Sequence, residues 1–209
     1  MNKGNIISRF LQNFQKPTGF WGRMILWGMN KGHSSLSLWG MSHITWKPNW
    51  NALDIGCGGG ANLTQMLHYC PQGKVYGIDI SQESVIFAQK KNKEYLSIRC
   101  FVEQGTVNQL PYDEKMFDVV TAFETVYFWE DLHQAFVEVA RVLKKDGYFL
   151  ICCELNDPSA RTFASRIDGM TIHSGDKLCS VLSESGFTAI KTYKQKRNAL
   201  CIVAQRSTF

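Results

Sequence analysis

The chain has 209 residues, of which 44% are hydrophobic and 20% charged, and this composition is typical of one globular domain with a substantial core. Its seven cysteines include no C-x-x-C pair, so the sequence indicates neither a zinc site nor a disulfide framework, and no cluster of acids indicates another metal. No apolar run reaches the ~20 residues of a membrane-spanning helix, and the N-terminus lacks the apolar core of a signal peptide. We therefore expect a cytoplasmic protein with no membrane span and no bound metal.

Residues 1–50 form a basic and aromatic segment. They contain six Lys or Arg residues and no Asp or Glu, whereas residues 51–209 contain 17 basic and 18 acidic residues. The first segment therefore carries +6 and the remainder −1, and five of the six tryptophans also lie in the first segment. Apolar residues at helical spacing predict helices over 5–14, 20–30 and 34–43. We expect a helical N-terminal lid segment, 1–50, that precedes an α/β domain, 51–209, without forming a domain of its own.

Strands and helices alternate from residue 51 onward. Strands are predicted at 51–55, 74–80, 97–105, 117–124, 147–154, 187–195 and 199–206. Helices are predicted at 61–70, 81–95, 131–143 and 176–185, and residues 155–174 are predicted to be irregular. This alternation favours right-handed crossovers and hence a Rossmann-like, seven-stranded, mostly parallel sheet with helices on both faces. Because only three polar residues join the last two strands, we expect them to form an antiparallel hairpin at the sheet edge.

The first predicted strand runs into a glycine loop, LDIGCGGGA, that allows two interpretations. The spacing Gly56-x-Gly58-x-x-Ala61 fits the dinucleotide fingerprint of NAD or FAD enzymes. The pattern D-x-G-x-G-x-G from Asp54 to Gly60 is that of a loop that binds S-adenosylmethionine. Both cofactors need glycines for close approach and a sharp turn, so Asp54 decides between them. Its carboxylate would repel a pyrophosphate, but it can orient the loop amides and favour the sulfonium and ammonium groups of S-adenosylmethionine.

Asp79 closes the second predicted strand. An acid at this point accepts hydrogen bonds from both ribose hydroxyls of an adenosine, a feature that NAD enzymes share. A dehydrogenase normally adds a second half or a substrate domain, for which 209 residues leave little room. No glycine is followed by Lys-Ser or Lys-Thr in the P-loop spacing, which excludes that motif. An NAD-dependent oxidoreductase is therefore the disfavoured alternative.

Four motifs occur in order: LDIGCGGG, VYGIDIS, VEQGTVNQLPYDEKMFDVVTAFE and EVARVLKKDGYFLICCE. From Asn51 to around Arg206 the chain therefore resembles the class I S-adenosylmethionine-dependent methyltransferases of the methyltransferase-11/UbiE-like group. The resemblance implies that the methionine end of the cofactor is lined by Asp54, Gly56, Cys57, Gly58 and Gly60. It also implies that Asp79 binds the ribose, that Ile80 contacts the adenine and that Phe123 lies beside the cofactor.

The loop after the third predicted strand departs from that group. Many of its members carry an Asp there that reaches the adenine amine, whereas this chain has Thr106, followed by Val107. A hydroxyl accepts the same hydrogen bond more weakly than a carboxylate. The sequence therefore predicts lower cofactor affinity unless Gln104 compensates.

The stretch from Glu124 to Trp129, after the fourth predicted strand, is expected to face the transferred methyl group. Glu124 is the candidate base, or the group that holds a cationic acceptor; alternatively, it binds the cofactor's amino group or a loop amide. Tyr127 and Trp129 are candidate contacts for a sulfonium or an aromatic acceptor, with packing in the core as the alternative. Methyl transfer depends mainly on alignment and the exclusion of water, so a general base is optional.

The N-terminal segment supplies further candidates. His33 lies in a predicted turn, Asn30 to His33, and is a candidate base. Trp21 and Trp39 are candidate walls of an acceptor pocket, and the alternative is that these aromatic side chains only dock helices onto the sheet edge.

The stretch after the fourth predicted strand also limits the class of acceptor. It lacks the Asn/Asp-Pro-Pro-Tyr motif of N6-adenine DNA methylases and the Pro-Cys nucleophile of cytosine C5 enzymes. We therefore predict a small-molecule methyl acceptor. The alternative is an RNA- or ribosome-associated methyltransferase or binding protein that uses the basic N-terminal segment, and it ranks lower because six charges over 50 residues are not a dense patch. The sequence leaves the oligomeric state open.

Overall fold

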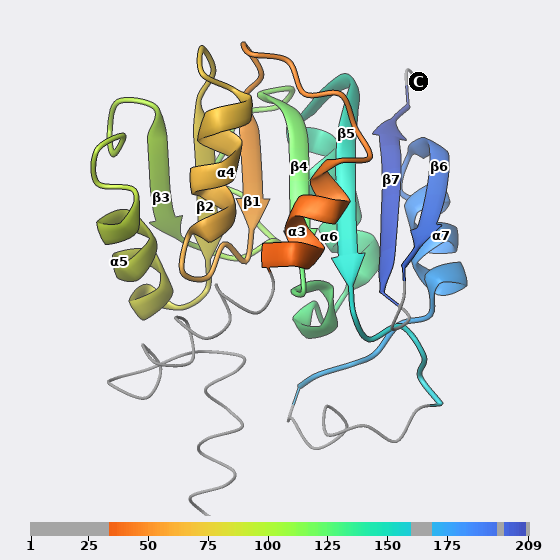
Figure 1. Ribbon diagram of the computed structural model, residues 1–209. Coiled ribbons are helices and arrows are strands. Elements are labelled where there is room, and N and C mark those ends of the chain that lie inside the picture. The colour runs from red at the N-terminus through yellow and green to blue at the C-terminus, as the bar shows by residue number, and fades with distance from the viewer. Residues whose placement is uncertain (1–33, 160–168, 196–198, 208–209) are drawn as a thin grey trace, which may run out of the picture.

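Seven strands form one sheet, in the order β3-β2-β1-β4-β5-β7-β6, in the computed structural model, which describes residues 34–159, 169–195 and 199–207 (Figure 1). The strands are β1 (Ala52–Ile55), β2 (Val75–Asp79), β3 (Cys100–Gln104), β4 (Phe117–Phe123), β5 (Leu143–Cys153), β6 (Phe187–Lys194) and β7 (Leu200–Arg206). Strands β1 to β5 pair in parallel, and β7 runs antiparallel to both β5 and β6. The predicted Rossmann-like sheet with an antiparallel C-terminal hairpin is therefore confirmed.

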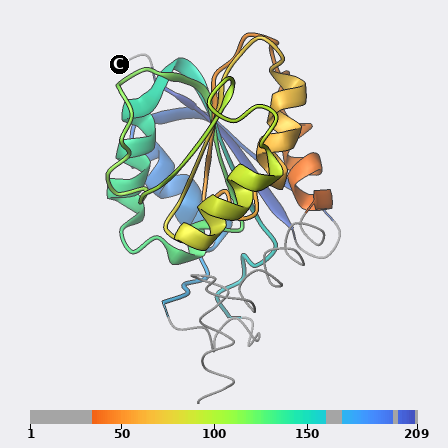
Figure 2. The same ribbon diagram turned by 90° about the vertical axis from the view of Figure 1, so that its left-hand side faces the viewer.

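Helices cover both faces of the sheet (Figure 2). One face carries α3 (Ser34–Met41), α4 (Ala61–Tyr69) and α5 (Gln82–Lys91). The other face carries α6 (Leu132–Val142) and α7 (Gly175–Glu184), and a short 3₁₀ turn, Val126–Phe128, follows β4. None of the described helices combines the length and the apolar character needed to cross a membrane.

Two hydrophobic layers hold the sheet between these helices. Because a parallel strand covered on both faces has no solvent side, β4 reads as a nearly unbroken apolar run, and Phe117 is fully buried. On one face, Leu63 and Met66 of α4 pack into the layer shared with α3 and α5. On the other face, Phe136 of α6 lies edge-on to Phe149 of β5, with ring centroids 5.5 Å apart. Full burial of such a side chain stabilises the fold by about 1.5–3 kcal/mol.

The largest differences from the predicted boundaries, at the end of α5 and the start of β5, coincide with contacts to distant residues. Helix α5 ends at Lys91 and not at residue 95, and the Asn92 amide group donates hydrogen bonds to the carbonyls of Ala88 and Gly60. Strand β5 begins four residues earlier than predicted, because Leu143 pairs with Phe117 of β4. Gly60 and Phe117 both lie far in the sequence from the residues that they contact, so local periodicity carries no signal for these two contacts.

Residues 34–50, which begin with helix α3, are the described part of the predicted lid segment. Leu36 and Met41 are buried on this helix, and they share a hydrophobic cluster with Trp50 and with residues of α4 and β1. Residues 1–33, which include Trp21 and His33, lie outside the described residues. The lid and a domain boundary at residue 50 therefore stay predictions.

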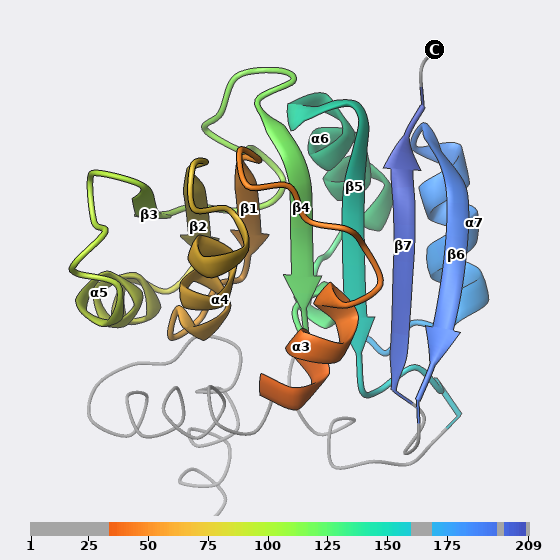
Figure 3. The same ribbon diagram turned by 45° about the horizontal axis from the view of Figure 1, so that its top comes forward.

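The carboxyl ends of the parallel strands meet at one edge of the sheet, the lower edge in Figure 1. Helix α3 lies in front of the carboxyl-terminal parts of β4 and β5 (Figure 3). Strand order reverses between β1 and β4, and open α/β sheets bind ligands beyond the strand ends at such a point.

Candidate active site

The glycine loop joins β1 to α4 at this edge. Gly56, Gly58 and Gly60 have φ angles of 72°, 50° and 75°, in the left-handed region that residues with a Cβ rarely adopt. The N–H groups of Gly56 and Cys57 both donate to the carbonyl of Ile78, at 2.8 and 3.1 Å, and this ties the loop to the end of β2. The three glycines are therefore required by the shape of the loop itself.

Neighbouring atoms occupy the space that a Cβ would need on two of these glycines. An ideal Cβ on Gly56 would lie 2.3 Å from Oγ1 of Thr125, and one on Gly60 would lie 2.8 Å from the Cβ of Ala88. The loop therefore lies directly against the turn after β4 and against α5. Because Thr125 follows Glu124, the glycine loop and the predicted acceptor region form one continuous site.

The Asp79 carboxylate holds the glycine loop in place. Its Oδ2 accepts a hydrogen bond from the N–H of Gly58 at 2.9 Å, and its Oδ1 accepts one from the N–H of Ser81 at 2.9 Å. Burial raises the pKa of Asp79, whereas these amide donors favour the ionised form. The adjacent Ile80 side chain is 53% exposed, and the Gln104 amide donates to the Ile80 carbonyl at 2.9 Å. An anchored carboxylate thus lies beside an exposed apolar side chain.

Asp54 is the most deeply buried acid of the site, at 1% exposure. Its Oδ1 accepts a hydrogen bond from the Thr121 hydroxyl at 2.6 Å, whereas its Oδ2 lacks a well-formed hydrogen bond from any described residue. Burial raises the pKa of Asp54 to about 7, although Thr121 and the nearby Asn62 side chain favour the ionised form. We expected Asp54 to orient the loop amides, but the hydrogen bond from the Gly58 N–H goes to Asp79.

The loop after β3 lies next to the end of β2. The N–H of Gly105 donates to the carbonyl of Asp79 at 3.0 Å. Thr106 is exposed, and its hydroxyl oxygen accepts a bond from the Asn108 N–H at 3.3 Å. Val107 is buried in the core at 5% exposure. The Thr106 hydroxyl is thus on the same edge as the Asp79 carboxylate, as the motif order implies.

Glu124 follows β4 in an unusual backbone conformation, with φ at +59°. Its N–H donates to the Cys152 carbonyl at 2.9 Å, and its Oε1 accepts bonds from the Tyr127 hydroxyl at 3.1 Å and the Glu154 N–H at 2.5 Å. Burial raises the pKa of Glu124 to about 7. Phe123, the residue before it, is 7% exposed at the end of the strand. The site therefore contains a half-buried carboxylate whose pKa is raised toward neutrality.

The two aromatic candidates beyond Glu124, Tyr127 and Trp129, are both buried. The Tyr127 hydroxyl accepts a hydrogen bond from the Leu155 N–H at 3.0 Å, and burial raises its pKa. Trp129 is 7% exposed and lies edge-on to Phe136 and stacked with Phe149, at centroid distances of 6.0 and 6.4 Å. For Trp129, this is the alternative to an acceptor contact, namely packing in the core.

Helix α3 brings Trp39 to the face of the sheet near the site. Trp39 is half-buried and lies edge-on to His43, with ring centroids 5.0 Å apart. A Cβ on Gly40 would lie 2.3 Å from Sγ of Cys152 and 3.0 Å from the Phe123 ring. Gly40 therefore allows α3 to lie directly on the carboxyl-terminal ends of β4 and β5.

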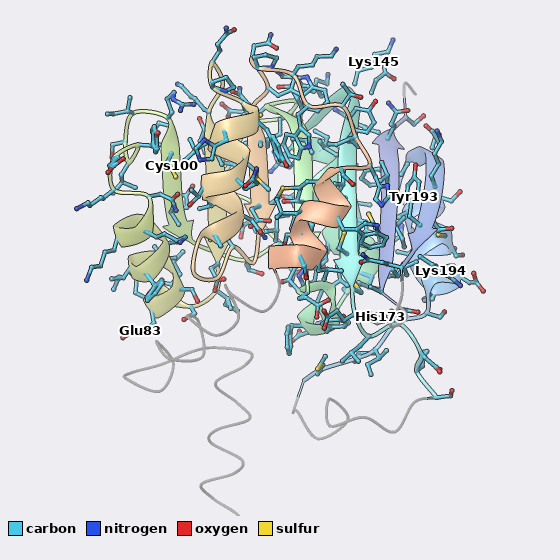
Figure 4. All side chains as sticks on the ribbon, in the orientation of Figure 1. Glu83, Cys100, Lys145, His173, Tyr193 and Lys194 are labelled. Atoms are coloured by element: carbon cyan, nitrogen blue, oxygen red, sulfur yellow. The ribbon has the colours of Figure 1, made fainter. Side chains whose placement is uncertain are left out.

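A segment that the sequence presents as irregular, residues 169–174, also reaches the site. The N–H of Thr171 donates to the Tyr127 carbonyl at 2.8 Å. His173 lies toward the carboxyl edge, whereas Lys145 lies at the opposite end of the molecule (Figure 4). The Nε2 of His173 is buried without a hydrogen-bond partner among the described residues, and burial lowers its pKa. Sequence reasoning missed this residue because the segment has no periodicity and no motif.

The acids of the site do not converge on a metal centre. Among the described residues, no group of three or more His, Cys, Asp or Glu side chains is arranged to hold a metal ion. All seven cysteines are free thiols and six are buried, including Cys57 within the glycine loop.

Known proteins share this sequence pattern. Residues 53–151 match the methyltransferase domain family. The chain is 36% identical over 103 residues to the uncharacterized methyltransferase YcgJ of Bacillus subtilis, covering 47% of this chain and 38% of that protein. It is 32% identical over 125 residues to the demethylmenaquinone methyltransferase of Alkalihalophilus pseudofirmus, covering 59% of this chain and 52% of that protein. The chain thus spans about half or less of the length of these curated relatives.

Solved structures share the fold. A chain of the Haloferax volcanii complex between the Trm112 methyltransferase activator and a methyltransferase matches with a TM-score of 0.80 at 19% identity, over 88% of this chain and 93% of that chain. A SAM-dependent methyltransferase from Aquifex aeolicus matches with a TM-score of 0.74 at 17% identity, over 87% of this chain and 97% of that chain. Residues 53–151 therefore carry a methyltransferase domain, and the chain shares the fold of class I S-adenosylmethionine-dependent methyltransferases.

Proposed function

We propose that this protein transfers the methyl group of S-adenosylmethionine to a small-molecule acceptor. The observation that carries the proposal is the pair of buried carboxylates behind the glycine loop, Asp54 and Asp79. A pyrophosphate would meet two negative groups there, whereas a sulfonium and an ammonium group would be matched by them. Two relatives, demethylmenaquinone methyltransferase and phosphoethanolamine N-methyltransferase 1 of Zea mays, are named for small-molecule acceptors, which supports the second half of the proposal.

The residues of the glycine loop suit the methionine end of this cofactor. When bound, S-adenosylmethionine supplies an electrophilic methyl group on a sulfonium. The backbone of Gly56, Gly58 and Gly60, with Cys57 between the first two, would line the methionine end of the ligand, in a left-handed turn that side chains at Gly56 and Gly60 would not permit. The unpartnered Oδ2 of Asp54 provides a negative group for a cation.

The ends of β2 and β3 suit the adenosine part. Asp79 would accept hydrogen bonds from the ribose hydroxyls while it continues to hold Gly58. The exposed Ile80 side chain would cover one face of the adenine, and its burial there would remove apolar surface from water. Thr106 and Val107 would flank the adenine amine, and Phe123 would lie near the methyl group.

Glu124 would act on the acceptor. Its turn touches the glycine loop, because Thr125 lies against Gly56, and this contact supports a place for Glu124 near the methyl group. A base works best when its pKa is close to the working pH, and the Glu124 pKa of about 7 meets that condition. We propose that Glu124 takes a proton from the acceptor or holds a cationic acceptor in place.

The cofactor is tested by binding measurements on the full chain. Calorimetry and thermal shift with S-adenosylmethionine and S-adenosylhomocysteine should show binding and stabilisation, and stabilisation by NAD alone would overturn the proposal. Asp79→Ala should weaken binding, because the loop amide of Gly58 loses its acceptor. Asp176→Ala, at an exposed acid in the first turn of α7, is the matched control and should leave the affinity unchanged.

The acceptor is tested by a screen of metabolites with a cofactor labelled in the methyl group. Transfer of label to a small molecule would support the proposal. Label transfer to RNA would instead favour the RNA- or ribosome-associated alternative. In that case RNA binding should weaken as salt is added, and it should also weaken when four basic residues are replaced by Ser: Lys3, Arg9, Lys16 and Arg23.

A further inference from the structure

Tyr127 joins three segments at the carboxyl edge. Its hydroxyl donates a hydrogen bond to Oε1 of Glu124 at 3.1 Å and accepts one from the Leu155 N–H at 3.0 Å. Its backbone carbonyl accepts a bond from the Thr171 N–H at 2.8 Å. One residue, 2% exposed, therefore connects the turn after β4, the loop after β5 and the segment before α7 through its hydroxyl and its backbone carbonyl.

Glu124 needs such support. Its φ of +59° lies in the left-handed region, which costs a residue with a Cβ about 1–2 kcal/mol. A strained conformation of this kind persists where neighbouring contacts determine it, and it often marks a functional position. The contacts here are the Cys152 carbonyl on the backbone side and the Tyr127 hydroxyl and Glu154 N–H on the carboxylate side.

We propose that Tyr127 is a positioning residue, which holds the Glu124 carboxylate at the end of β4 and fastens the segments at Leu155 and Thr171 around it. The ring is buried in the core and the hydroxyl already makes two hydrogen bonds, so Tyr127 does not present its ring to a sulfonium or an aromatic acceptor. That this positioning contributes to methyl transfer rests on the proposed function of Glu124. The positioning itself can be measured without cofactor or acceptor.

A positioning role has a signature that core packing lacks. A hydrogen bond donated to a carboxylate favours its charged form, so removal of the Tyr127 hydroxyl should raise the pKa of Glu124 further. The other groups that face this carboxylate are Glu154, whose negative charge raises the same pKa, and the buried thiol of Cys153. Replacement of Tyr127 with Phe leaves Glu154 unchanged. It also removes the hydrogen bond between the Tyr127 hydroxyl and the Cys153 thiol, but burial raises the pKa of that thiol well above its ordinary value, so no charge facing Glu124 is added or removed.

The test is a pH titration by carbon-detected NMR of the full chain labelled at the glutamate carboxyl carbon. Tyr127→Phe should raise the midpoint of the Glu124 resonance, assigned with Glu124→Gln, by roughly one pH unit. Amide exchange at Leu155, which loses its acceptor, should become about tenfold faster, whereas exchange at Thr171, which is bonded to the Tyr127 backbone carbonyl, should not change. The matched control is Tyr148→Phe, which removes a hydroxyl from a β5 tyrosine that packs against Trp50, and neither readout should change.

An unchanged Glu124 midpoint in folded Tyr127→Phe would overturn the proposal. If that variant does not fold, Glu124→Ala provides the reciprocal test, because it removes the acceptor of the Tyr127 hydroxyl and should speed amide exchange at Leu155. Unchanged exchange at Leu155 in Glu124→Ala would likewise overturn it. Failure of the wild-type protein to bind S-adenosylhomocysteine would refute the proposed function and leave both readouts interpretable.

Discussion

The loop after β1 and the turn after β4 meet the same structural demand in opposite ways. Each follows a buried parallel strand, and each needs a residue in the left-handed region, Gly56 at φ 72° and Glu124 at φ 59°. At Gly56, Thr125 leaves no room for a Cβ. At Glu124, a long side chain is kept and is held by the Tyr127 hydroxyl and the Glu154 N–H. The chain uses glycine where the backbone itself lies close to its neighbours, and it retains a strained residue where a carboxylate is placed.

Gly56→Ala should break the first half of this comparison with the largest effect. The new Cβ would fall 2.3 Å from Oγ1 of Thr125 in a conformation that alanine disfavours. Strain and overpacking each cost about 1–3 kcal/mol, so we expect roughly hundredfold weaker binding of S-adenosylhomocysteine by calorimetry. Gly186→Ala is the control, because Gly186 has φ 86° but open space around its Cβ position, and its affinity should equal that of the wild type.

Glu124→Gln should impair methyl transfer at the turn after β4 without impairing cofactor binding at the glycine loop. Glutamine preserves the size of the side chain but removes the charge and the basicity of the carboxylate. With the acceptor found by screening, we expect kcat to fall roughly a hundredfold. Because the glycine loop is unchanged, calorimetry should give a dissociation constant for S-adenosylhomocysteine within about twofold of the wild type. Full activity in this variant would exclude Glu124 from the proposed role.

Asp54 should make cofactor binding depend on pH. Burial holds its pKa at about 7 without ligand, and Asp79 and the Cys57 thiol are its titratable neighbours. A bound cation favours the carboxylate, so binding releases a proton, and affinity should rise by up to about tenfold per pH unit below pH ~7 and then level off. Calorimetry in two buffers of different ionisation enthalpy would measure the proton. In Asp54→Asn this slope should shrink, and an unchanged slope would contradict the assignment.

The same raised pKa of Asp54 should make the stability of the ligand-free fold change with pH in the opposite direction to cofactor affinity. Since the unfolded chain ionises Asp54 near pH 4, its contribution is present below that pH and is lost as pH rises toward about 7. We therefore compare the urea midpoints of the ligand-free wild type and Asp54→Asn at pH 5 and at pH 8. Going from pH 5 to pH 8 should lower the midpoint of the wild type relative to that of Asp54→Asn. A difference between the pair that does not vary with pH would contradict this expectation.

The smallest effect concerns the backbone at Glu124. Both Glu124→Ala and Glu124→Gly remove the carboxylate and its hydrogen bonds, but only glycine relieves the left-handed φ of 59°. Urea unfolding should show the glycine variant to be more stable than the alanine variant by about 1 kcal/mol, because the left-handed penalty exceeds the entropic cost of glycine in the unfolded chain. Equal stabilities would mean that the turn carries no strain.

Local pattern was sufficient for most of the fold. The apolar spacing of Leu63, Met66 and Leu67 predicts the buried face of α4, and all three are buried. The short polar link after residue 195 predicts the antiparallel pairing of β6 with β7. Such features depend on residues a few positions apart, so a single sequence contains them.

Contacts between distant residues were not predictable in the same way. Asp54 is bonded to Thr121, 67 positions away, and Glu124 to Glu154, 30 positions away. Trp129 was a candidate substrate contact because it follows Glu124 in the sequence, but its ring packs with Phe149. Position in a motif shows which loop a residue belongs to, whereas the neighbouring strands decide which way its side chain points.

By itself, then, the sequence determined the type of sheet and the position of the glycine loop. It also predicted the two acids, Asp54 and Asp79, that favour S-adenosylmethionine, since each of these features follows from spacing and charge along the chain. Only the tertiary structure decided that Asp79, and not Asp54, holds the loop amide, and that Tyr127 supports Glu124. The physical reason is that burial and hydrogen-bond partners are set by the packing of β1, β2, β4 and β5 side by side. The two carboxylates with a pKa of about 7, Asp54 and Glu124, owe that value to burial, and burial is a property of the folded chain.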